Sequence, residues 1–105
     1  MSRMNVTLEG EVITRRFFHV LDVLKQKRRI RGLQSFTKAY GLNYWNMSTI
    51  KNSPHCHALK PEWLAFLVQD YDVSAEYLLT GVGSIFKSDV SVPAPEDVDT
   101  GIETP

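Results

Sequence analysis

The chain has 105 residues, the length of a single domain, of which 43% are hydrophobic and 23% are charged. No apolar run approaches the roughly 20 residues of a membrane-spanning helix, and the polar first residues lack the apolar core of a secretory signal, so we expect a cytoplasmic protein rather than a membrane or secreted one. The single cysteine, Cys56, excludes an internal disulfide.

The net charge of zero conceals two halves of opposite charge. Residues 1–60 carry eleven Lys and Arg against three Asp and Glu, whereas residues 61–105 carry one against nine. Five of the basic residues fall close together, namely Lys25, Lys27, Arg28, Arg29 and Arg31. A basic half is typical of a surface that meets phosphates, although a solvated face without a partner would have the same composition.

Two helices are predicted in the first forty residues. The segment from about 11 to 27 is amphipathic, with Phe17, Leu21 and Leu24 at positions i, i+4 and i+7. We expect Gly32 to stop this helix, because glycine is favoured just beyond a helix end. The second helix, 33–40, ends at Gly41, which can take the left-handed backbone conformation of a tight turn.

Three further helices follow along the chain. The segment 44–52 begins after Asn43, whose side chain can cap it, and its Met47 and Ile50 are expected to face inward. Pro61 suits the first position of a fourth helix, and Ser74 can cap a fifth. No alternating run predicts a sheet, so the expected fold is all-α and compact, with five helices.

The last segment, 88–105, holds three prolines and five acidic residues but few large apolar ones. Such a composition predicts a disordered acidic tail. The expected organisation is therefore a flexible lead (1–10), one folded domain (11–87) and this tail.

The stretch QSFTKAYGLNYWNMSTIKNS resembles the helix-turn-helix of the lambda-repressor and Cro-like family. The family's small helix residue, turn glycine, following apolar residue and two buried positions fall on Thr37, Gly41, Leu42, Met47 and Ile50. The later stretch WLAFLVQDYDVSAEYLLTGVGSIF is similar to the closing helix pair of phage-repressor-type domains. The chain departs from the family at Leu33, where Gln is frequent, and at Thr37, where Ala is frequent.

The resemblance implies sequence-specific binding of double-stranded DNA by a prokaryotic or phage-like transcriptional regulator, acting as a homodimer on two half-sites. Helix 44–52 would read the major groove with Tyr44, Trp45, Asn46, Ser48 and Thr49. Gln34, Asn43, Lys51 and Asn52 would position the protein on phosphates. A solvated helix face and ordinary capping would account for the same residues without a partner.

The sequence gives less support to other functions. A helical protein-interaction module could use Tyr44 and Trp45, with the acidic tail as a second contact. The run of His55, Cys56 and His57 has no second ligand pair at zinc-like spacing and no third catalytic group, so we expect no metal, no cofactor and no enzymatic activity.

Overall fold

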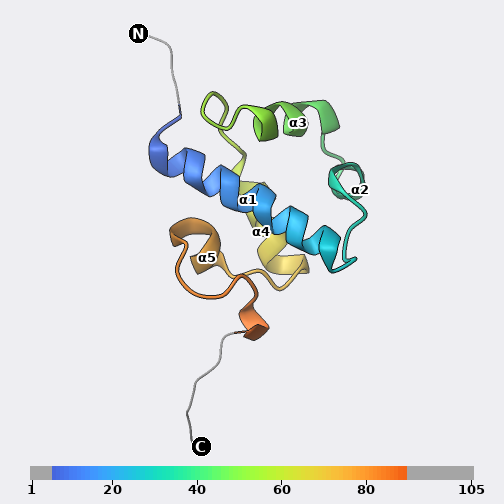
Figure 1. Ribbon diagram of the computed structural model, residues 1–105. Coiled ribbons are helices and arrows are strands. Elements are labelled where there is room, and N and C mark those ends of the chain that lie inside the picture. Colours follow the sequence, from blue (N-terminus) through green and yellow to red (C-terminus); the bar gives the residue numbers. More distant parts are fainter. Residues whose placement is uncertain (1–5, 90–105) are drawn as a thin grey trace, which may run out of the picture. The chain divides into compact units, whose positions relative to one another are not determined.

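The computed structural model describes residues 6–89, and within this range the chain is all-α, as expected, with no β-strand (Figure 1). Its helices are α1 (Leu8–Gln26), α2 (Leu33–Ala39), α3 (Tyr44–Asn52), α4 (Pro61–Asp70) and α5 (Ala75–Thr80), followed by a 3₁₀ turn, η1 (Lys87–Asp89). Residues 1–5 of the predicted lead and residues 90–105 of the predicted tail lie outside the described residues.

Helix α1 begins at Leu8, three residues before the predicted start. The reason is a capping contact, in which the Thr7 hydroxyl oxygen accepts a hydrogen bond from the Gly10 N–H at 3.1 Å. Glu9 and Glu11 in the first turn add favourable charge at the positive end of the helix dipole. The local cap therefore extends the helix beyond the stretch that apolar spacing alone indicates.

The end of α1 also differs from the prediction, because Gly32 does not stop the helix. The Arg28 N–H bonds to the Lys25 carbonyl at 3.0 Å, and the Arg29 N–H bonds to the Leu24 carbonyl at 2.8 Å. This pair of bonds is a Schellman motif, and it places Arg28 in the left-handed region with φ 62°. Gly32 lies instead at the N-cap of α2, where its carbonyl accepts from the Phe36 N–H.

Helices α2 and α3 are joined by a second Schellman motif, centred on Gly41. The Leu42 N–H bonds to the Thr37 carbonyl at 2.8 Å, and the Gly41 N–H bonds to the Lys38 carbonyl at 3.4 Å. Gly41 has φ 65°, the conformation for which glycine was expected here. Asn43 then caps α3, as predicted, through a 2.8 Å hydrogen bond from the Asn46 N–H to its side-chain oxygen.

The chain divides into two units, residues 1–64 and 65–105. In the first unit, α3 contacts both α2 and α1. Its core is aromatic and aliphatic, with Phe17 of α1 stacked edge-on against Phe36 of α2 at 6.0 Å between ring centroids. Met47 and Ile50 of α3 are buried, as predicted, so the inner face of α3 is fixed by packing.

The second unit is closed by backbone hydrogen bonds between distant positions. Residues 84–87 return to residues 72–74, where the Ser74 N–H bonds to the Ile85 carbonyl at 2.7 Å and the Lys87 N–H bonds to the Asp72 carbonyl at 2.8 Å. Val73 and Phe86 form an isolated antiparallel bridge. Ser74 caps α5, as predicted, by accepting from the Tyr77 N–H at 3.2 Å.

Candidate nucleic-acid interface

The outer face of α3 is polar and aromatic. Because Met47 and Ile50 point inward, the residues on the opposite side of the helix face away from the core. Trp45 is 76% exposed, and Asn46 and Thr49 are also exposed. The remaining two predicted base-reading residues, Tyr44 and Ser48, are partly buried.

Hydrogen bonds within α3 determine which polar groups its outer face can offer. The Thr49 hydroxyl donates to the Trp45 carbonyl at 2.9 Å. The side-chain oxygen of Asn43 is used in the cap, so its amide NH₂ is the group that can donate to a phosphate. Asn46 receives that cap through its backbone N–H, which leaves both ends of its exposed side-chain amide for a base edge.

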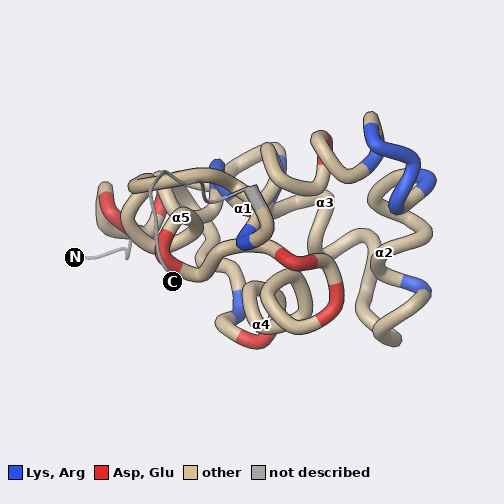
Figure 2. Tube along the Cα trace, turned by 90° about the horizontal axis from the view of Figure 1, so that it is seen from below, with Lys and Arg blue, Asp and Glu red and all other residues tan. Residues whose placement is uncertain are grey.

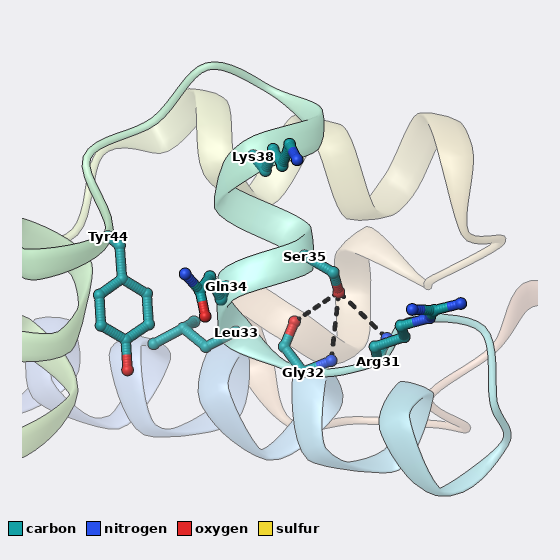
Figure 3. A pocket seen from close by; sticks show the side chains of 7 residues that line it. All are labelled: Arg31, Gly32, Leu33, Gln34, Ser35, Lys38 and Tyr44. Carbon is teal, nitrogen blue, oxygen red and sulfur yellow. Dashed lines mark hydrogen bonds between the residues drawn. The ribbon is translucent and has the colours of Figure 1, made fainter.

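A hollow of about 550 Å³ lies where α2 and α3 begin, and we call it the α2 hollow. It is lined by Arg31, Gly32, Leu33, Gln34, Ser35, Lys38 and Tyr44. Figure 3 shows the Tyr44 ring beside Leu33 and Gln34, so the structure brings together one predicted base-reading residue and one predicted phosphate-positioning residue. Ser35 holds the backbone of two lining residues in place, because its hydroxyl oxygen accepts hydrogen bonds from the Arg31 N–H at 3.0 Å and the Gly32 N–H at 3.2 Å.

Two basic residues of the α2 hollow, Arg31 and Lys38, are absent from the predicted site. Lys38 follows Gln34 by four residues on α2, which places the two side chains on the same side of the helix. That spacing is a signal from which Lys38 can be identified. Arg31 adjoins the N-terminus of α2, and its guanidinium has the fork of donors that suits a phosphate group.

The other predicted phosphate-positioning residues lie at the far end of α3. Lys51 and Asn52 are both exposed in its last turn. A second hollow, of about 300 Å³, lies here and is lined by Phe18, Leu21, Asp22, Lys25, Gly32, Leu33 and Lys51. Gln34 of α2 lines a hollow with Tyr44 at the start of α3, whereas Lys51 is in the last turn of α3, and the two hollows share Gly32 and Leu33 in their lining.

The stretch of sequence that forms α2 and α3 carries charge of one sign. Between Asp22 and Glu62 the sequence has eight Lys and Arg and no Asp or Glu. Figure 2 shows basic positions gathered at the connection between α1 and α2. An anionic partner would therefore be attracted to this part of the first unit, where the carboxylate of Asp22 on α1 lines the same hollow as Lys51 but is outnumbered by the basic side chains.

His55, Cys56 and His57 are exposed in the loop between α3 and α4. Within residues 6–89, no group of three His, Cys, Asp or Glu side chains is arranged to hold a metal ion. The same residues contain no helix that is both long and apolar enough to cross a bilayer.

Comparison of the chain with protein-family models, with curated proteins and with solved structures found no match.

Proposed function

We propose that this protein is a sequence-specific regulator of transcription, phage-like or prokaryotic, that binds double-stranded DNA. In this proposal α2, the turn at Gly41 and α3 form a helix-turn-helix of the lambda-repressor type, and α3 enters the major groove. The groove is about 12 Å wide and accepts a helix with its side chains. The partner would be a duplex, bound by two copies of the chain on two half-sites.

The observation that carries the proposal is the exposed face of α3 in a stretch of purely basic charge. Trp45, Asn46 and Thr49 are held outward by the burial of Met47 and Ile50. Asn46 has the amide donor and acceptor that pair with adenine, and side chains such as Thr49 contact the thymine methyl group. The α2 hollow and Lys51 supply donors for phosphates beside the groove.

The test is selection of bound duplexes from random or genomic fragments, followed by titration of the selected duplex at several salt concentrations. With about four to six phosphate contacts per subunit, the slope of log K against log salt should be on the order of −4 to −5. A slope near zero, or the failure to enrich any sequence, would contradict the proposal.

Two variants separate base reading from general binding. Asn46→Ala should relax preference at one base position by about 1–3 kcal/mol, whereas Gln34→Ala should weaken binding to all sequences alike. Gln69→Ala, which removes an exposed amide from α4, serves as the matched control and should leave both properties unchanged.

A second candidate is a protein-interaction module, favoured by the aromatic pair at the start of α3, of which Trp45 is exposed and Tyr44 is partly buried. The Tyr44 and Trp45 rings meet edge to face at 5.1 Å, and large exposed aromatic side chains are common at the centres of protein interfaces. This candidate predicts binding of a protein partner that is insensitive to salt and is lost with Trp45→Ala, without enrichment of any duplex sequence.

A further inference from the structure

The side of α3 that carries Trp45 and Thr49 offers a DNA base more apolar surface than hydrogen-bonding groups. Trp45 and Thr49 are one turn apart and therefore lie on the same side of the helix. The Thr49 hydroxyl gives its only hydrogen to the Trp45 carbonyl, at 2.9 Å. What Thr49 can contribute toward a partner is thus its methyl group and oxygen lone pairs, and Trp45 contributes an indole ring with a single N–H donor.

The Trp45 indole packs against the ring of the neighbouring Tyr44. Its ring lies edge-on to that of Tyr44, with centroids 5.1 Å apart and planes at 82°, an attractive arrangement for aromatic rings. Tyr44 in turn lines the α2 hollow beside Leu33 and Gln34 (Figure 3). An aromatic side chain that is 76% exposed is therefore braced by a residue anchored against α2.

We infer that the Trp45–Thr49 face of α3 recognises thymine through its 5-methyl group. This inference rests on the proposed function, because it concerns the bases that α3 meets in the major groove. Among the four bases, thymine alone presents a methyl group there, and apolar contact is the means by which proteins detect it. The basic stretch between Asp22 and Glu62 favours a nucleic acid over an apolar protein surface as the occupant of this face.

The experiment replaces thymine by deoxyuridine, one position at a time, in the selected duplex. This change removes only the methyl group and keeps every hydrogen-bonding atom of the base. At each thymine under Trp45 or Thr49, affinity should fall about fourfold, the expected effect of losing one buried methyl group. At other thymines the substitution should leave affinity unchanged.

Two variants of Thr49 form a matched pair for this test. Thr49→Ser keeps the hydroxyl and loses the methyl group, so the thymine-to-deoxyuridine difference at its base should disappear. Thr49→Val keeps the methyl group and loses the hydroxyl, so the difference should remain. Trp45→Ala should abolish the difference at its own base, and melting curves of all three variants check that the fold is retained.

The outcomes distinguish the inference from the proposed function. If no duplex is enriched or bound, both are overturned. If a duplex is bound specifically but every deoxyuridine variant binds as tightly as the parent duplex, the inference alone is overturned. It is also overturned if Trp45→Ala changes the oligomeric state, measured by sedimentation, and leaves the thymine-to-deoxyuridine difference intact, since Trp45 would then belong to a protein interface.

Discussion

Gly41 determines the direction in which the chain leaves α2 and enters α3. Its φ of 65° causes little strain in glycine, but in a residue with a Cβ the strain energy of this conformation is roughly 1–2 kcal/mol. No atom lies within 4 Å of the position that a Cβ would occupy, so Gly41→Ala should lower the free energy of unfolding by about 1 kcal/mol through backbone strain alone. Gly41→Asn should cost less, because Asn tolerates this conformation. Urea unfolding measures both, and an Ala variant as stable as the parent would show that the turn can form without a left-handed residue.

Ile50 and Asn46 illustrate how folding and binding are assigned to different faces of α3. Ile50 is 4% exposed, so Ile50→Ala should lower the free energy of unfolding by roughly 2–4 kcal/mol by leaving a cavity. Asn46 is exposed, and Asn46→Ala should change stability by no more than about 0.5 kcal/mol while altering base preference. Melting curves and binding-site selection on the same two proteins check the separation; equal destabilisation by both changes would contradict it.

At the level of the elements, the connection between α1 and α2 holds an arginine in a position that suits glycine. Arg28 has φ 62°, and replacing it by Gly should raise the free energy of unfolding by about 0.5–1 kcal/mol, since the relief of strain exceeds the entropy that glycine adds to the unfolded chain. If the guanidinium of Arg28 contacts phosphate, Arg28→Gly should also reduce the magnitude of the slope of log K against log salt by about one. Arg28→Lys keeps both the charge and the strain and should preserve both properties. A less stable Gly variant would show that the side chain of Arg28 itself supports the fold.

The elements differ in how far sequence can predict them, and the difference is physical. The spacing of Met47 and Ile50, the glycine at 41 and the capping Asn43 are local signals, and they give α2 and α3 to within one residue. The left-handed Arg28 follows from hydrogen bonds that close the last turn of α1, a conformation that the residue type disfavours. The Val73–Phe86 bridge involves a single pair of residues, so no alternating pattern in the sequence predicts it.

The part of the candidate site at the start of α3 could be predicted only in part from the sequence. Tyr44 and Trp45 are adjacent aromatic residues, and both are predicted from their place in the sequence to face a base. Packing separates them, because Tyr44 lies against the beginning of α2 whereas Trp45 has no such neighbour and faces outward. That distinction depends on where α2 lies relative to α3, which local spacing does not specify. Arg31 lines the α2 hollow for the same reason, whereas Lys38 could have been identified from its spacing of four residues from Gln34.

For the whole molecule, the opposite charges of the two halves predict that the last residues moderate binding. Residues 90–105 hold four Asp and Glu and no Lys or Arg, so their removal changes the net charge from 0 to +4. Affinity for non-specific duplex should rise several-fold at roughly 20 mM salt and return to the parent value near 0.3 M, where screening is strong. The melting temperature should change little, because Phe86 and Lys87 of the closing bridge are retained.

A variant of full length provides the control for this deletion. Changing Glu96 and Glu103 to Gln, and Asp97 and Asp99 to Asn, removes the same charges and keeps the segment. It should reproduce the gain in low-salt affinity if charge is the cause. A gain seen with the deletion alone would instead indicate that the segment obstructs the partner by its bulk.

The two tryptophans give this chain a pair of separate optical reporters. Trp63 is 2% exposed and lies 5.9 Å from the Phe17 ring, so its fluorescence comes from an apolar surrounding that exists only in the folded state. Trp45 is 76% exposed, so we expect it to emit at longer wavelength and to be the indole that a dissolved quencher such as iodide reaches. Trp63→Phe leaves a protein whose emission reports contacts at α3, and Trp45→Phe leaves one whose emission reports unfolding. Occupancy of α3 and integrity of the core can therefore be followed independently, without any attached dye.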